Sequence, residues 1–155
     1  MMEVFVAYTP ESSLDELGNT LDAWEKAGLE PVAIECKKKK FELVRRVTAE
    51  NLSRADYILA ELGTEPVEFG FGEIASEYLG GHSDVGLVGA WRIGQTQNEW
   101  PNSVVVCRKG IVEKWPTPKT EFYIQEHVEA YRLAGQKALL CRQIHYRRTN
   151  KSLPS

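Results

Sequence analysis

Short apolar runs alternate along this chain with segments whose apolar residues recur every three or four positions. The apolar runs are rich in β-branched and aromatic residues, which is typical of buried strands, and they predict strands at 3–8, 31–36, 57–62, 84–91 and 103–108. The segments with helical spacing predict helices at 14–27, 41–55, 67–79 and 122–141. Gly28 and the Gly80–Gly81 pair mark helix ends, and residues 63–66 predict a turn.

This alternation of strand and helix is typical of βαβ units. We therefore expect a single α/β domain of the three-layer Rossmann-like (flavodoxin-like) class, with a five-stranded, mostly parallel sheet and helices on both faces. The domain is expected to span residues 1–141, followed by a basic C-terminal tail at 142–155. In such sheets ligands bind beyond the carboxyl ends of the strands. That edge is expected to collect residues 8–13, 36–40 and 61–68.

Composition narrows the classes of function and compartment. The 155 residues suit one domain, and the net charge of -3 argues against a nucleic-acid polymer as partner. No apolar run approaches the roughly 20 residues of a membrane span, and the first nine residues hold no basic region of the kind a signal peptide needs. Cys36, Cys107 and Cys141 are odd in number and widely spaced, which favours reduced thiols in a cytoplasm.

Four acidic residues lie at the end of the third predicted strand or at the start of the following helix: Glu61, Glu65, Glu68 and Glu73. A helix N-terminus favours negative charge, so some of these carboxylates have a purely structural explanation. Gly70 and Gly72 weaken the first turn of that helix by about 1 kcal/mol each relative to alanine. Close approach by a ligand or by a neighbouring part of the chain would explain them.

The same stretch resembles a known family. Ala55-Asp56 before the strand, with Glu68-Phe69-Gly70-Phe71-Gly72 after it, is similar to the nucleoside 2-deoxyribosyltransferases and the related 2′-deoxynucleoside 5′-phosphate N-hydrolases. The resemblance implies that Glu68 is a nucleophile that attacks the anomeric carbon of the sugar, so that the N-glycosidic bond of a nucleoside or nucleoside monophosphate is cleaved or transferred. An alternative alignment puts the nucleophile at Glu73, and Glu68 is preferred for the residues that follow it.

The resemblance also implies the surroundings of the nucleophile. Glu65 or Glu50 would hold or protonate the leaving base, Tyr8 and the Ser12–Ser13 loop would line the sugar pocket, and Gly70 would allow close approach of the substrate. Neither a cofactor nor a metal is required, and a homo-oligomer is implied in which a neighbour completes the pocket. Structural roles compete with these, since serines before a helix cap it and a tyrosine ending a strand packs on the core.

Two departures from the family pattern support a different hypothesis. The family's aspartate in the preceding helix falls near Thr48, with Glu50 the nearest acid, and only Glu65 matches the aspartate that contacts the base. A noncatalytic nucleotide-sensing or protein-interaction module of Rossmann-like fold is therefore the alternative. A flavin-binding, flavodoxin-like protein is a third hypothesis, although the loop at 9–13 holds few of the hydroxyl residues that would cradle a flavin phosphate.

Overall fold

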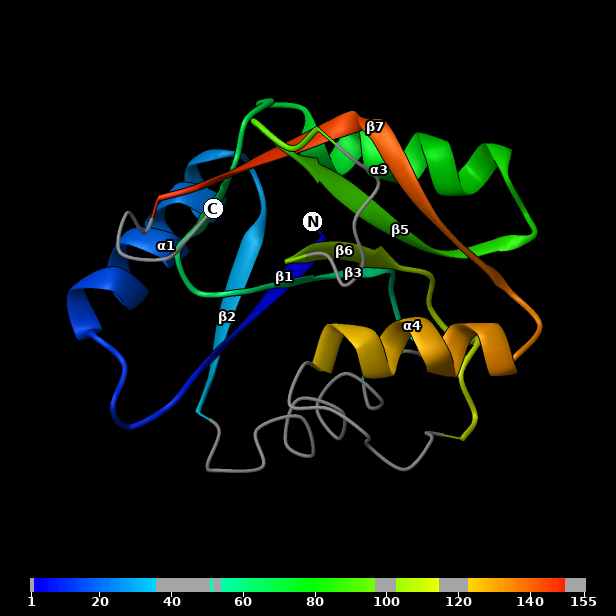
Figure 1. Cartoon of the computed structure of the whole chain (residues 1–155), viewed down its shortest axis with the longest axis horizontal. Coiled ribbons are helices and arrows are strands. Elements are labelled where there is room, and N and C mark those ends of the chain that lie inside the picture. Colours follow the sequence, from blue (N-terminus) through cyan, green and yellow to red (C-terminus); the bar gives the residue numbers. More distant parts are fainter. Residues whose placement is uncertain (1, 36–50, 52–53, 97–102, 115–122, 150–155) are drawn as a thin grey trace.

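A computed structural model describes residues 2–35, 51, 54–96, 103–114 and 123–149 of the chain (Figure 1). The predicted helix at 41–55 and the basic loop at 37–40 fall almost entirely outside these residues. The described elements, in chain order, are β1 (Glu3–Tyr8), α1 (Leu14–Lys26), β2 (Glu30–Glu35), β3 (Tyr57–Ala60), β4 (Thr64–Pro66), α3 (Phe71–Gly81), β5 (Val85–Arg92), β6 (Val104–Cys107), α4 (Tyr123–Leu133) and β7 (Lys137–Arg148). Among these residues no helix is both long enough and apolar enough to cross a membrane.

The strands form one seven-stranded mixed sheet in the order β2-β1-β3-β6-β5-β7-β4. β1 lies parallel to β2 and β3, as expected, but β6 is antiparallel to both β3 and β5, and β4 is antiparallel to β7. The expectation of a five-stranded, mostly parallel Rossmann-like sheet is therefore wrong. One reason is length: residues 93–103 separate β5 from β6, and a parallel crossover needs about a dozen residues or more.

The sheet is strongly curled, like half of a barrel (Figure 1). β3 is the third strand of the sheet and β4 is the seventh, yet only residues 61–63 separate them in sequence. The far edge must therefore bend back until β4 lies beside the carboxyl end of β3. The Thr149 N–H, just after β7, donates to the Gly63 carbonyl at 2.8 Å and extends the pairing of β7 with β4 to the turn after β3.

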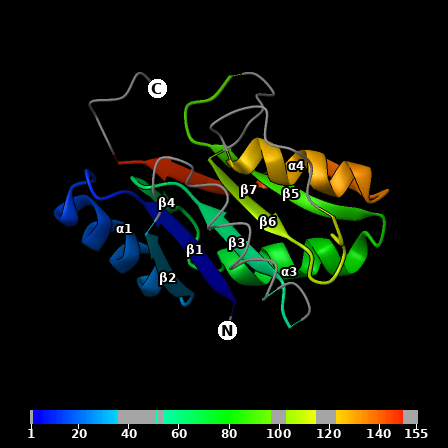
Figure 2. The same cartoon turned by 90° about the horizontal axis from the view of Figure 1, so that it is seen from below.

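Helices cover both faces of this sheet, and each face has its own core (Figure 2). Because side chains alternate along a strand, Val4 and Val6 pack with α1 and α3 on one face, whereas Phe5 points to the other face and its α4 core. The first core centres on the edge-to-face pair of Trp24 and Phe71, whose ring centroids are 5.2 Å apart.

Three predicted elements differ most from the observed ones in type or in bounds. The helix predicted at 122–141 ends at Leu133, and residues 137–148 form the twelve-residue strand β7, which includes the first part of the predicted basic tail. The turn predicted at 63–66 contains β4, because Thr64–Pro66 pair with β7. The helix predicted from residue 67 begins at Phe71, so Glu68 precedes the helix.

Candidate functional site

A cleft of about 370 Å³ lies between α1 and β4, at the place where the curled sheet returns to the first helix. The chain beyond β7 also reaches its rim through Thr149. Its lining residues are two glutamates, an asparagine, three threonines and an alanine: Glu16, Asn19, Thr20, Ala23, Thr64, Glu65 and Thr149. The cleft therefore has a mixed polar and apolar surface, and its walls come from segments far apart in sequence.

The α1 wall follows from the pattern of the helix. Ser13 caps α1 by accepting the Glu16 N–H at 3.2 Å, which fixes where the helix begins. Leu17 and Trp24 are buried and hold one stripe of α1 against the sheet. The cleft residues of α1 recur at 16, 19, 20 and 23, which is the spacing of a second stripe on the same helix. Packing of the first stripe thus positions the second one toward β4.

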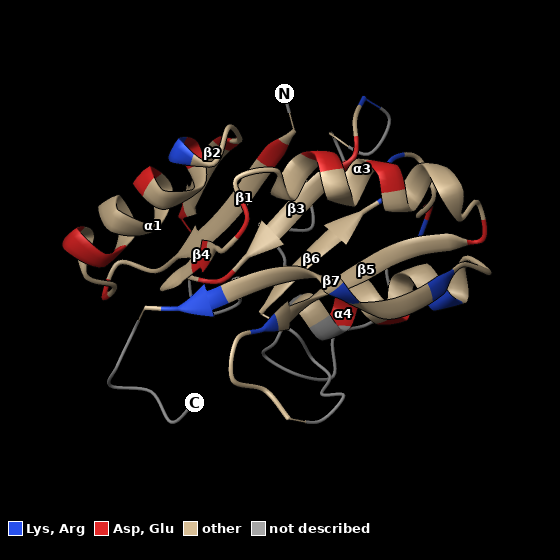
Figure 3. Cartoon of the chain, turned by 90° about the horizontal axis from the view of Figure 1, so that it is seen from above, with Lys and Arg blue, Asp and Glu red and all other residues tan. Residues whose placement is uncertain are grey.

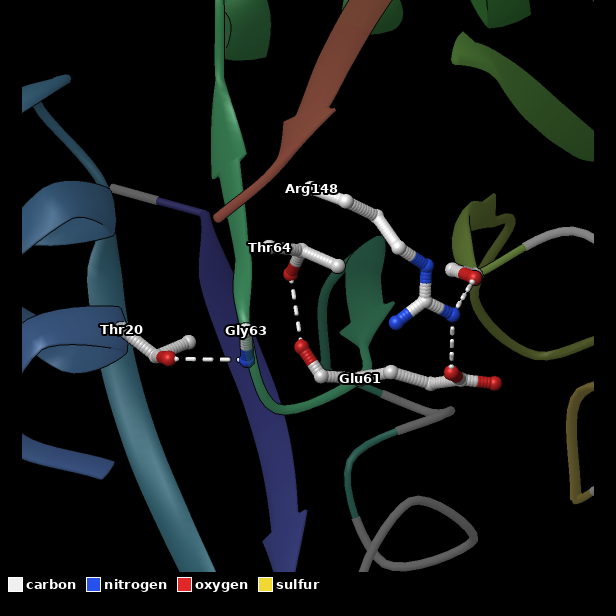
Figure 4. Close-up of polar contacts among 6 residues, drawn as sticks. Thr20, Glu61, Gly63, Thr64 and Arg148 are labelled. Atoms are coloured by element: carbon white, nitrogen blue, oxygen red, sulfur yellow. Dashed lines mark hydrogen bonds and ion pairs between the residues drawn. The ribbon is translucent and has the colours of Figure 1, made fainter. Parts of the chain in front are cut away.

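The β4 wall is fixed by hydrogen bonds around the turn at Gly63 (Figure 4). Gly63 has a φ of 80°, which favours glycine, and its buried N–H donates to the Thr20 hydroxyl at 3.0 Å. That hydroxyl donates in turn to the Glu16 carbonyl at 2.8 Å. The Thr64 hydroxyl donates to the Glu61 carbonyl at 2.7 Å. These bonds attach α1 to the connection between β3 and β4.

Three acidic residues of the segment 61–68 pair with three basic residues near the carboxyl end of β7. Figure 3 shows the blue carboxyl end of β7 next to red parts of the chain around β4. The pairs are Glu61 with Arg148, Glu65 with Arg147, and Glu68 with His145. These acids were the candidates for chemistry in the sequence, and the structure shows that each already has a basic partner. The partners come from the segment that the sequence predicted as the final helix and tail.

The Glu61–Arg148 pair is the most sheltered of the pairs between arginine and glutamate here. Arg148 contacts Glu61 at 2.7 Å, with 21% and 27% of the two side chains exposed, and it also donates to the Ser103 hydroxyl (Figure 4). The Glu61 N–H donates to the Ser103 carbonyl at 3.0 Å. Nearby, burial raises the pKa of the Tyr146 hydroxyl, although its hydrogen bond with Ser103 acts in the opposite direction.

The hydrogen-bonding capacity left in the cleft consists mainly of acceptors. Thr20 and Thr64 have already used their hydroxyl hydrogens on backbone carbonyls, so only lone pairs of their oxygens remain. The carboxylates of Glu16 and Glu65 can only accept when ionised. Asn19 and Thr149 can both donate and accept. A ligand in this cleft could therefore donate to Glu16 and Glu65, and could exchange hydrogen bonds in either direction with Asn19 and Thr149.

Glu65 is the one sequence-predicted site residue among those that line the cleft. Glu68 lies outside the lining: one carboxylate oxygen contacts His145 Nδ1, and the other accepts the His145 N–H at 3.0 Å. The predicted Glu68 nucleophile is therefore held against β7. Glu73, the alternative nucleophile, is exposed in the first turn of α3. Glu50 lies outside the described residues.

The remaining candidates have visible structural roles. Tyr8 packs against the first core, and the Ser12 hydroxyl accepts the Thr9 N–H at 3.0 Å. Ser13 is the cap of α1, as the structural alternative predicted. Gly70 is the residue before α3, so it does not weaken the helix interior. Gly72 faces a close neighbour, because an added Cβ would lie 2.9 Å from Leu29 Cδ2.

Sequence reasoning missed the α1 wall of the cleft and the partners on β7. A signal for the wall was present, because Glu16, Asn19, Thr20 and Ala23 have helical spacing and are small or polar. No local signal could have paired residues 61–68 with 145–148, which are about 80 positions away along the chain. Within the described part of the chain, no group of three or more His, Cys, Asp or Glu residues could hold a metal ion.

The comparisons with known proteins show a similarity in fold only. No protein-family model matches the chain, and no curated protein matches it. The crystal structure of A197 from STIV is similar, with a TM-score of 0.53 and 12% sequence identity over 95% of this chain and 81% of that chain. At this identity the similarity concerns the arrangement of the elements and carries no statement about activity.

Proposed function

We propose that this chain binds a small, hydroxyl-rich molecule of the nucleoside class in the cleft between α1 and β4. The observation that supports the proposal most is the lining, in which the side chains of Glu16, Asn19, Glu65 and Thr149 place hydrogen-bonding groups around a space of about 370 Å³. The hydroxyls of a sugar supply matching donors. A volume of this size lies within the range of about 300–1,000 Å³ typical of small-molecule sites.

The charge of the lining favours a nucleoside over a nucleotide. Glu16 and Glu65 contribute negative charge, and within the described part of the chain no lysine or arginine is among the lining residues. A phosphate group would meet these carboxylates and find few donors, so it would pay for its desolvation without compensation. The proposal therefore narrows the ligand to a compound without a 5′ phosphate.

Cleavage or transfer at the N-glycosidic bond is a second candidate function, supported by the presence of two carboxylates in one cleft. Glycoside hydrolysis uses such a pair, one as acid for the leaving group and the other as base or nucleophile. Because Glu68 is held by His145 outside the lining, we assign these roles to Glu16 and Glu65. Glu65 would protonate the leaving base, which is the role that the family resemblance implied for Glu65 or Glu50.

Calorimetry with a panel of ribo- and deoxynucleosides and their 5′ monophosphates tests both candidates, with chromatography of each mixture for released base, with and without an acceptor base. We expect nucleosides to bind and monophosphates to bind at least about tenfold more weakly. Glu65→Gln should weaken binding, whereas Glu77→Gln, an exposed change on α3, should not. A panel in which no nucleoside binds would refute the proposal, and base release lost in Glu65→Gln would establish the catalytic candidate.

The expected cytoplasmic location and homo-oligomeric state belong to the same proposal. Cys107 and Cys141 are buried free cysteines, which suits a reducing compartment. Light scattering of the purified chain would measure the oligomeric state directly.

A further inference from the structure

We propose that Arg147 is a positioning residue of the α1–β4 cleft, because it holds the Glu65 side chain in the place from which Glu65 contacts a bound nucleoside. This inference rests on the proposed function, since it concerns binding in the same cleft. It goes further by assigning part of the affinity to a residue of the neighbouring strand that is not among the lining residues.

The strand pairing places Arg147 and Glu65 directly opposite each other. β4 and β7 are antiparallel, and Glu65 is the register partner of Arg147. Side chains in such a pair project from the same face of the sheet, with Cβ atoms about 4.5–5.5 Å apart. Arg147 Nη1 donates to Glu65 Oε1 at 3.1 Å. The contact therefore follows from the register of the two strands.

Glu65 is the acid through which β7 can act on the cleft. Among the described residues, segment 61–68 forms three acid–base pairs with β7, and Glu65 is the one acid of the three that lines the cleft. Arg148 and His145 hold their own partners, Glu61 and Glu68, outside the lining. A change at Arg147 should therefore reach the ligand through Glu65.

The benefit of the contact lies in order rather than in added charge. Glutamate has a long, flexible side chain, and fixing such a side chain in one conformation costs entropy. In this chain 29% of the Glu65 side chain is exposed, and the contact with Arg147 restricts it before a ligand arrives. A ligand that binds to a preorganised side chain pays less of this entropy, so its dissociation constant is lower.

Calorimetry on two variants of Arg147 tests this role. The probe is the compound that binds the wild type most tightly among adenosine, guanosine, cytidine, uridine, thymidine and the 2′-deoxy forms of the first three. Arg147→Met should raise its dissociation constant about three- to fivefold. Arg147→Lys should leave the constant within about twofold of the wild type, because the contact uses one guanidinium nitrogen and an ammonium group also donates from one nitrogen.

A double-mutant cycle with Glu65→Ala separates positioning from general damage to the fold. If Arg147 acts through Glu65, Arg147→Met should change the dissociation constant by less than about 1.5-fold when residue 65 is already alanine. A structural defect would weaken binding in both backgrounds. Arg132→Met is the matched control, since it removes an exposed arginine from the last turn of α4, and it should leave binding unchanged.

Three results would overturn the inference and leave the proposed function standing. Tighter binding in Arg147→Met would mean that the arginine competes with the ligand for Glu65. Unchanged binding in that variant would mean that the contact has no effect on the cleft. A loss that persists beside Glu65→Ala would mean that Arg147 acts on the fold. A wild type that binds none of the nucleosides overturns the inference and the proposed function together, and this result precedes any comparison of variants.

Discussion

Gly86 lies where β5 passes under α4 and the turn that follows it. A Cβ added there would lie 2.5 Å from Tyr131 Cδ1 and 2.7 Å from Gln136 Cβ. Tyr131 cannot easily retreat, because its ring is fully buried and its hydroxyl donates to the Arg108 carbonyl at 2.6 Å. The residue therefore sets how closely α4 approaches the sheet, and with it the packing of the second core.

We predict that Gly86→Ala lowers the free energy of unfolding by about 1–3 kcal/mol, since overpacking forces side chains and backbone to shift. Gly18→Ala is the matched control on α1, where an added Cβ meets nothing within 4 Å. That change should stabilise the protein by about 0.5–1 kcal/mol, because alanine loses less entropy in a helix. Urea unfolding of both variants checks the pair, and similar effects of the two changes would contradict the packing argument.

Burial of the Tyr57 hydroxyl makes the stability of the protein depend on pH. Burial raises the pKa of this hydroxyl well above the usual value near 10. The unfolded chain therefore loses this proton at lower pH than the folded chain does. The corresponding stability is fully present below about pH 10 and is lost as the pH rises toward the folded-state pKa.

We accordingly predict that the free energy of unfolding falls more steeply above about pH 10 in the wild type than in Tyr57→Phe. The difference in slope should approach about 1.4 kcal/mol per pH unit, the value for one proton. Urea unfolding at a series of pH values between 8 and 11 measures both slopes. Parallel curves for the two proteins would show that Tyr57 ionises as freely in the folded state as in the unfolded one.

At the scale of elements, Arg108, the residue after β6, caps the carboxyl end of α3 with its side chain. Its guanidinium donates to the carbonyls of Leu79 at 2.6 Å and His82 at 2.9 Å at the end of that helix, and to Val85 at 2.9 Å at the start of β5. The last carbonyls of a helix have no partner within it, and the Arg108 side chain adds donors here to the His82 N–H that Leu79 already accepts. Arg108 therefore fixes the connection between α3 and β5.

Replacing Arg108 with methionine should lower the free energy of unfolding by about 1.5–3 kcal/mol, the range for hydrogen bonds to a charged group. Lys109→Met, which alters the exposed next residue, should change it by less than about 0.5 kcal/mol. Amide exchange around residues 79–85 gives a second measurement, since it should accelerate in the arginine variant alone. Equal stability of the two variants would indicate that water replaces the arginine.

The elements also show which parts of the fold the sequence could reveal. β1 was predicted with its observed bounds, because a short, buried, mostly apolar strand carries a clear pattern. β7 was not, because its register with β5 shifts between Ala90 and Trp91. Ala138 packs in the second core, whereas Cys141 and Ile144 pack in the first. The buried residues at 138, 141 and 144 therefore have a spacing of three that resembles a helix.

The candidate site was predictable to a smaller extent than the strands. Glu65 was recognised because acids cluster after β3, but the same pattern also selected Glu68, which β7 holds outside the cleft. The difference between these two acids depends on Arg147 and His145, which a strand of unexpected register brings alongside. Local patterns do not contain that information, since pairing over about 80 positions is decided by the whole sheet.

At the scale of the whole molecule, the curl of the sheet makes the cleft. α1 follows β1 near one edge and β4 is the opposite edge strand, so a flat sheet of this order would leave the two walls on different sides of the molecule. Polar contacts rather than a strand ladder hold the closure, because Arg148 reaches Glu61 and Ser103 across strands that are not neighbours in the sheet (Figure 4).

A double-mutant cycle on Glu61 and Arg148 measures what this closure contributes. We predict a coupling free energy of about 1 kcal/mol between Glu61→Gln and Arg148→Met, since the pair is partly sheltered and less than a third of each side chain is exposed. The Asp22–Lys26 pair is the reference: its side chains are 59% and 76% exposed, and its coupling should be smaller than that of Glu61 and Arg148.

The two cycles should also respond differently to salt, because screening acts most on exposed charges. Raising the salt concentration to about 1 M should abolish the coupling between Asp22 and Lys26 and leave most of that between Glu61 and Arg148. If the closure contact also shapes the cleft, Arg148→Met should weaken nucleoside binding although Arg148 is not a lining residue. Coupling no larger than that of the reference pair, with unchanged binding, would mean that hydrogen bonds such as Thr149 to Gly63 hold the curl without help from the ion pair.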